Sequence, residues 1–154
     1  MFESLPDIPR LFTALAEWGA ALVYVFVVAR SASSNALNPN AAIPRWRLAA
    51  AAIGGLVVLV GAHEMLGHAP LSLWVPGMMT AYALVWCVIR VGTASDWRWV
   101  THMSARAFIV AEFAASLAWQ VVVYSHADKP YWHPLSFGGF AVIASACLAV
   151  VYFF

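Results

Sequence analysis

The sequence predicts an all-α membrane protein, a polytopic bundle of about five transmembrane helices. Of its 154 residues, 64% are hydrophobic and only 10% are charged, and the mean hydropathy is +0.81. A soluble domain is closer to half apolar and about a quarter charged. We therefore expect residues 1–154 to form one integral membrane domain, a multi-pass protein of the cell membrane whose first partner is the lipid bilayer.

Apolar stretches long enough to cross a bilayer recur along the chain. A transmembrane helix needs roughly 20 apolar residues, and the five stretches that qualify are residues 8–29, 48–65, 71–91, 100–124 and 135–154. Pro9 lies in the first turn of its stretch, where proline is tolerated. Pro76 and Gly77 predict a bend in the first half of the third stretch. The connection over residues 30–47 has the Ser, Asn and Pro content of a loop.

The distribution of cations predicts the orientation, because cytoplasmic loops are enriched in Lys and Arg. The loops after the first and third stretches contain five of these residues, whereas the loops predicted on the other side of the membrane contain only Arg10 and Lys129. We therefore expect the N-terminus outside and the C-terminus in the cytoplasm, and the apolar ending "VVYFF" favours a further segment on the cytoplasmic side. The five residues of the first and third loops are Arg30, Arg45, Arg47, Arg90 and Arg98.

Polar residues in the fourth stretch share one helical face. Glu112, Ser116 and Gln120 are spaced four apart, so they lie one above the other. Alanines flank this stripe, and small residues at such spacing let another helix approach closely. The stripe is therefore expected to face the interior of the bundle. The flanking residues are Ala111, Ala114, Ala115 and Ala118.

The first stretch repeats this pattern, with Arg10, Thr13 and Glu17 on one face. If the first and fourth helices pack together, Glu17 and Glu112 meet in the outer half of the interior. Arg106 lies about 240° around the helix from Glu112, at 100° per residue. It does not pair with that carboxyl group, and we expect Arg106 and Arg10 to be interface anchors that extend toward the membrane surface.

The two glutamates support two interpretations. In one, they are hydrogen-bonded packing groups that hold the helices in register. In the other, Glu17, Thr13, Glu112, Ser116 and Gln120 form a polar intramembrane site for a ligand or a proton. Ionisable groups inside a membrane are costly to bury and commonly mark functional sites.

The histidines do not predict a metal site. In "HEMLGH", His63 and His68 are five residues apart, whereas the zinc-protease motif places two histidines four apart on one face. His126, Asp128 and His133 are interpreted as solvated loop residues. We expect no metal and no cofactor, haem included, since nothing fixes two histidines opposite each other at one depth.

Two stretches carry a family resemblance: "LPDIPRLFTALAEWGAALVYV" and "ARAFIVAEFAASLAWQ". Together they resemble the membrane-embedded sensor region of Gram-positive sensor histidine kinases. These kinases have a GHKL-type ATP-binding domain and are related to the accessory-gene-regulator quorum sensors. The resemblance implies a homodimeric input domain that perceives a peptide or small-molecule signal from outside. It also implies transmission to a cytoplasmic kinase module, whose ATP-binding boxes and phosphoacceptor histidine this chain does not contain.

Other functional classes remain open from the residues alone. A small proton-coupled transporter or carrier subunit would use the buried Glu17 and Glu112, together with a broken third helix. A structural subunit of a larger membrane complex would suit the alanine-rich packing faces. The sequence has no Ser-His-Asp pattern, HExxH motif or phosphate-binding loop that would favour a membrane enzyme. It also has no Lys/Arg-rich block of the kind that favours nucleic-acid binding.

Overall fold

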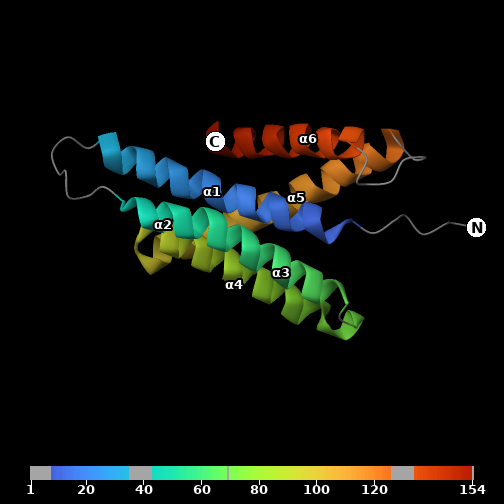
Figure 1. Ribbon diagram of the computed structural model, residues 1–154, viewed down its shortest axis with the longest axis horizontal. Coiled ribbons are helices and arrows are strands. Elements are labelled where there is room, and N and C mark those ends of the chain that lie inside the picture. The colour runs from blue at the N-terminus through green and yellow to red at the C-terminus, as the bar shows by residue number, and fades with distance from the viewer. Residues whose placement is uncertain (1–7, 35–42, 69, 126–133, 154) are drawn as a thin grey trace, which may run out of the picture.

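The computed structural model describes residues 8–34, 43–68, 70–125 and 134–153 (Figure 1). Within these ranges all regular structure is helical, and there is no strand. The elements are the α-helices α1 (Arg10–Ser34), α2 (Arg45–Ala49), α3 (Gly55–Gly67), α4 (Trp74–Thr93), α5 (Trp97–Ser125) and α6 (Pro134–Phe153), the π-helical segment η2 (Ala50–Gly54) and the 3-10 turn η3 (Leu71–Leu73).

The predicted helical membrane character is confirmed in its coarse form. Four helical segments are long and apolar enough to cross a membrane by length and composition: Arg10–Ala32, Arg45–Leu66, Trp74–Thr93 and Trp97–Tyr124. In α6, the apolar helical segment is shorter, Phe137–Ala149. Several helices extend beyond the predicted apolar stretches. Hydropathy reports the apolar part of a helix, and polar or interfacial residues can continue the same hydrogen-bonded turns.

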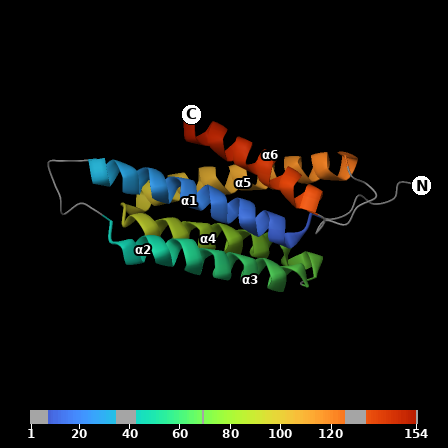
Figure 2. The same ribbon diagram turned by 45° about the horizontal axis from the view of Figure 1, so that its top comes forward.

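Helix α1 is the centre of the bundle. It packs against α3, α4, α5 and α6, with α2, α3 and α4 on one side of it and α5 and α6 on the other (Figures 1 and 2). Small residues on α1 allow this close packing. The fully or almost fully buried small residues of α1 are Ala14, Ala16, Ala20 and Ala21.

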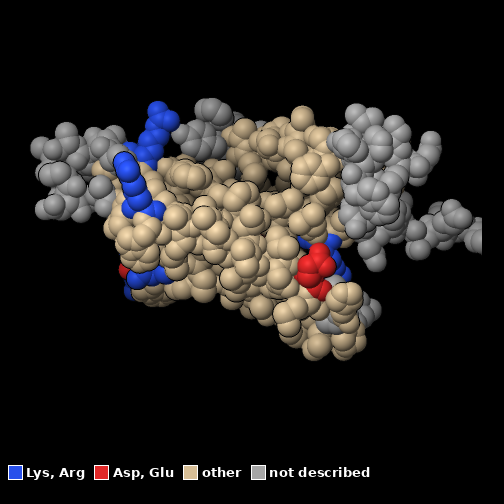
Figure 3. All heavy atoms as spheres, in the orientation of Figure 1, with Lys and Arg blue, Asp and Glu red and all other residues tan. Residues whose placement is uncertain are grey.

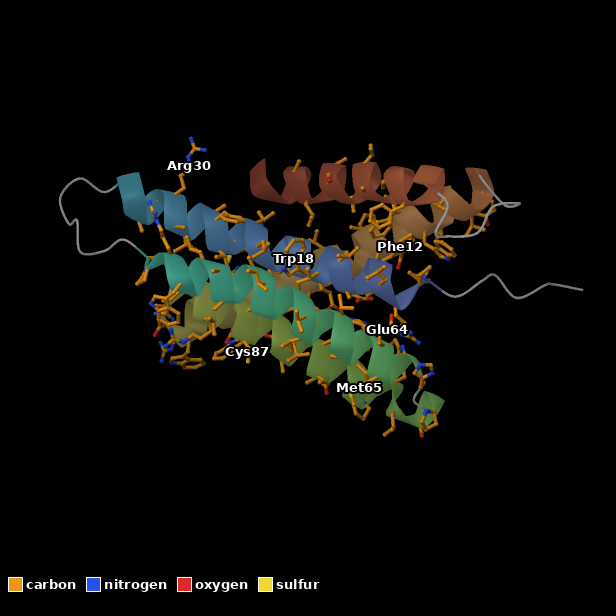
Figure 4. All side chains as sticks on the ribbon, in the orientation of Figure 1. Phe12, Trp18, Arg30, Glu64, Met65 and Cys87 are labelled. Carbon is orange, nitrogen blue, oxygen red and sulfur yellow. The ribbon has the colours of Figure 1, made fainter. Side chains whose placement is uncertain are left out.

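The bundle has two chemically different ends. We call the end at which α1 begins the Arg10 end, and the opposite end, from which Arg30 projects, the Arg30 end (Figure 4). Basic side chains gather at the Arg30 end, where α1 finishes and α2 begins (Figure 3). The asymmetry in the number of cations between loops is therefore also an asymmetry in space.

Side chains of the Arg30 end complete the helix termini there. Arg47 donates from Nε to the Val91 carbonyl oxygen at 2.7 Å and from a terminal nitrogen to that of Arg90 at 3.3 Å. The Val91 carbonyl group lies in the last turn of α4, where carbonyl groups lack helical partners. The Arg90 carbonyl oxygen also accepts from the Ala94 backbone N–H at 3.1 Å. Ala94 follows in the left-handed conformation, with φ of 55°. Asp96 then accepts a hydrogen bond from the Arg98 backbone N–H at 3.0 Å, which caps the start of α5.

The alanine-rich face of α5 points into the bundle, as predicted. Ala111, Ala114, Ala115 and Ala118 are buried. Large apolar side chains occupy the opposite face, which is the arrangement expected where a helix meets lipid tails rather than water. The exposed residues of this outer face are Ile109, Phe113, Leu117 and Val121.

The predicted bend at Pro76 and Gly77 is wrong. Helix α4 is continuous from Trp74, so Pro76 lies in its first turn, where a backbone N–H has no helical partner to lose. The irregular segment is η2, in the preceding helix. There the Trp18 indole N–H of α1 donates to the Ala52 carbonyl oxygen at 2.7 Å (Figure 4). This side chain bonds to the backbone where the regular α-helical ladder changes.

Candidate functional site

A buried ion-pairing contact joins α1 to α3. Glu17 is 0% exposed and His63 is 3% exposed, and the distance from His63 Nε2 to Glu17 Oε2 is 3.0 Å. His63 faces α1 because it continues a buried stripe at four-residue spacing. The other members of this stripe are Ala51, Gly55 and Leu59, of which the first two are small enough to bring the helices together.

A second carboxyl group reaches the same place from α5. Glu112 interacts electrostatically with Glu17, and also with His63 and Arg10. Three helices thus contribute one ionisable side chain each to the Glu17–His63–Glu112 cluster.

Each member of this cluster has a buried polar atom without a hydrogen-bond partner within the described part of the chain. These atoms are Glu17 Oε1, His63 Nδ1 and Glu112 Oε1. An unsatisfied buried polar group costs about 1–3 kcal/mol. The cluster is therefore more expensive than packing alone requires, which favours a role in binding.

A pocket of about 220 Å³ opens beside the cluster, at the Arg10 end between α1, α3 and α4. His63 belongs both to the pocket wall and to the cluster, so its imidazole lies between the pocket and Glu17. A Cβ atom at Gly77 would lie 3.0 Å from Leu66 Cδ2, so this glycine lets α4 lie close against α3. The pocket lining consists of the polar residues Arg10 and His63 and of Leu66, Pro70, Leu73, Trp74, Gly77, Met78 and Ala81.

The structure brings some of the predicted site residues together and separates others. Glu17 and Glu112 meet through the packing of α1 against α5, as their positions on the two helices predict. Thr13 and Ser116 are half-buried. The expectation that Gln120 faces the interior is wrong, because this residue is exposed. Glu112 is only half-buried, at the edge of the buried face. Four residues turn a helix by about 400°, so each step rotates the stripe by roughly 40°, and from this edge two steps carry it out of the interface.

The predicted interface anchors lie in different surroundings. Arg10 is exposed and forms part of the pocket wall, so it is placed to do more than reach the membrane surface. Arg106 is half-buried and lies within electrostatic range of the Tyr24 hydroxyl group of α1. Its role as an anchor stays a prediction.

His63 is the residue that sequence reasoning missed. The sequence presents it only as a candidate metal or haem ligand, and His68, its neighbour in the HEMLGH stretch, is exposed. Its four-residue spacing from Leu59 and Gly55 is the signal that places it on the buried face. Among the described residues, no group of three or more His, Cys, Asp and Glu side chains is arranged to hold a metal ion. His126, Asp128 and His133 lie outside the described residues.

Comparison of the chain with models of known protein families, with curated proteins and with solved structures gave no match.

Proposed function

We propose that this chain is the multi-pass membrane sensor domain of a signalling protein of the cell membrane. It would perceive a peptide or small-molecule signal in the pocket at the Arg10 end and pass it to a cytoplasmic histidine kinase module, acting as a homodimer. The observation that carries the proposal is the shared position of His63, which lines the pocket and also holds the buried contact between α1 and α3.

The access to this site favours a receptor. Beyond Glu17, toward the Arg30 end, the buried side chains are mostly apolar, and the buried hydroxyl groups of Thr93 and Ser104 donate to carbonyl oxygens of their own helices. A Cβ atom at Gly92 would lie 2.6 Å from Val25 Cγ2, which indicates how closely the helices pack there. A carrier must open its site to each side in turn, whereas a receptor needs one entrance. The side chains that close this half include Ala21, Val25, Ala51, Val85, Ile89 and Val100, all 0–1% exposed.

The central position of α1 offers a route for the signal. A ligand can shift a conformational equilibrium only by binding one state better than the other. A ligand at His63 changes the contact between α3 and α1, and α1 also packs against α5 and α6. Helix α6 then runs from the Arg10 end toward the Arg30 end (Figure 1).

The charge distribution supports the orientation that such a sensor needs. The basic residues gather at the Arg30 end (Figure 3), which the positive-inside rule assigns to the cytoplasm. The pocket then opens outside, and α6 ends on the cytoplasmic side.

A proton-coupled carrier is the second candidate, and the pairing of Glu17 with Glu112 behind the pocket favours it. Proteoliposomes that contain a pH-sensitive dye and carry an imposed pH gradient separate the two functions. A sensor is expected to give the same proton leak as protein-free vesicles, with no difference between the wild type and Glu112→Gln. Proton uptake that this substitution abolishes would establish the carrier instead.

A kinase readout tests the sensor directly. The chain would be joined after Phe154 to a GHKL-type kinase module, and autophosphorylation would be measured in nanodiscs. Glu17→Leu removes the contact with His63 and is expected to change the basal autophosphorylation rate several-fold. Glu64→Gln is the matched control, because Glu64 is exposed next to His63 in the chain. Equal rates for all three proteins would contradict the proposal.

A further inference from the structure

We propose that the pocket at the Arg10 end binds an apolar molecule through its carboxylate group, held jointly by Arg10 and His63. The inference rests on the proposed function for the statement that this pocket is the signal site, and it adds the chemical class of the signal.

The polar part of the pocket is suited to an anion. Arg10 is always cationic and presents a planar set of donors that matches a carboxylate. His63 Nε2 faces Glu17, and its buried Nδ1 has no partner in the described part of the chain. A protonated imidazole donates from both nitrogens. Glu17 then accepts from one N–H, and the other, which is buried, has no acceptor among the described residues.

The carboxyl groups of the cluster lie behind His63 rather than in the pocket. Among the described residues that line the pocket, Arg10 and His63 are the only polar ones, and α4 supplies apolar side chains and Gly77. Glu17 from α1 and Glu112 from α5 neighbour His63 from the interior, while Glu64 of α3 is exposed. A ligand that enters therefore meets two cation-forming groups first. Glu17 already pairs with His63, so Arg10 is the group whose charge a ligand carboxylate balances.

The remaining wall selects an apolar body. Its large apolar side chains are those of Leu66, Leu73, Trp74 and Met78. The volume of about 220 Å³ exceeds the roughly 150 Å³ of an apolar cavity that accommodates benzene. A phenyl or branched alkyl group joined to a carboxylate by a short linker matches this size. A free arylalkanoic acid and the C-terminus of an apolar peptide share this chemistry.

Binding to the full chain in phosphatidylcholine nanodiscs tests the inference. The probes are 3-phenylpropionate and N-acetyl-leucyl-phenylalanine, each compared with its neutral amide and corrected for uptake by empty nanodiscs. A hydrogen bond to a charged group contributes about 1.5–3 kcal/mol, so at least one acid is expected to bind roughly 10- to 100-fold more tightly than its amide. The acid that binds distinguishes a free acid from a peptide terminus.

Variants assign this preference to the two residues. Arg10→Gln and His63→Gln are expected to reduce the preference for the acid at least tenfold, while Arg10→Lys retains part of it. His68→Gln is the matched control, since His68 is exposed and lies outside the pocket wall. Size-exclusion profiles and near-ultraviolet circular dichroism check that each variant is folded.

Several results would overturn the inference. These are equal affinity for acid and amide, tighter binding of 3-phenylpropylamine, or no binding of any probe at 1 mM. Two combinations of results distinguish failure of this inference from failure of the proposed function. Acid-selective binding together with acid-driven proton uptake into vesicles would retain the pocket chemistry and replace the sensor by a carrier. Kinase control without acid selectivity would retain the sensor and reject the carboxylate.

Discussion

The same helices form both halves of this bundle, but the buried side chains differ in polarity between the two halves. Toward the Arg30 end, the interior of the bundle contains Val25 of α1, Ala51 of η2 and Ile89 of α4, which are 0–1% exposed. Toward the Arg10 end, the interior holds Glu17 and His63, with Glu112 beside them. One half is closely packed and mostly apolar. The other contains an ionisable cluster and a pocket.

This difference predicts that the two halves contribute differently to the stability of the bundle. Apolar packing stabilises a membrane bundle through close contact between helices. Buried polar pairs are commonly neutral or unfavourable relative to apolar residues of the same shape. The Arg30 half is therefore expected to hold the bundle together, while the Arg10 half keeps a costly arrangement that suits recognition.

The largest expected loss of stability comes from removing one partner of the Glu17–His63 contact. Glu17→Leu leaves the His63 imidazole buried without its carboxylate, and we expect it to lower the free energy of unfolding by about 3–5 kcal/mol. Unfolding in mixed micelles with increasing dodecyl sulfate measures this loss.

The double variant Glu17→Leu/His63→Leu sharpens this test. Because it removes both polar groups, it is expected to recover most of the lost stability. If the double variant were as unstable as Glu17→Leu, the pair itself would be a stabilising element, and the contrast between the two halves would not hold.

The next largest effect is expected in the apolar half. Gly92→Ala places a Cβ atom 2.6 Å and 2.7 Å from the two Val25 methyl groups and 3.1 Å from the Ala51 Cβ atom. Overpacking of this kind costs about 1–3 kcal/mol, again measured by unfolding in micelles.

Gly61→Ala is the matched control for this substitution. Its Cβ atom would meet nothing within 4 Å, so it is expected to stabilise the helix by roughly 0.5–1 kcal/mol through backbone entropy alone. Equal effects of the two substitutions would show that the Arg30 half is looser than its distances indicate.

The smallest predicted loss concerns the turn at the Arg30 end. Asp96→Ala removes the side-chain acceptor for the Arg98 N–H and is expected to cost about 1 kcal/mol. Asp96→Asn keeps a capping oxygen and is expected to unfold like the wild type. Affinity of the pocket for 3-phenylpropionate is expected to be the same in both variants, since the cap lies at the opposite end. A change in that affinity would contradict this prediction, because it would show that the Arg30 end affects binding at the Arg10 end.

The sequence could predict part of the candidate site because two of its members follow helix periodicity. Glu17 shares a face with Thr13, and Glu112 lies next to the alanine face of α5, so each position relative to its own helix follows from local spacing. Gln120 shows the limit of that reasoning. Residues four apart are neighbours on a helix, but the rotation accumulates over two steps and brings the third residue to the surface.

Non-local features were not predictable in the same way. Whether His63 meets Glu17 depends on the axial offset and the rotation of α3 against α1, and these depend on where glycine and alanine permit close approach. The pocket arises where the start of α1, the end of α3 and the start of α4 meet. The segments of its wall are far apart along the chain, so no single stretch encodes it.

By itself, therefore, the sequence determined the helical class, the approximate extents of the helices that are long and apolar enough to cross a membrane, the inward alanine face of α5 and the asymmetry of charge between loops. Only the tertiary structure decided that His63 is the partner of Glu17, that Arg10 borders a pocket and that the irregular helical segment is η2 rather than the region of Pro76. The physical reason is that the two kinds of feature depend on residues at different separations along the chain. Hydropathy and helical periodicity are properties of a single segment, whereas the pairing of buried polar groups depends on how several helices pack against one another.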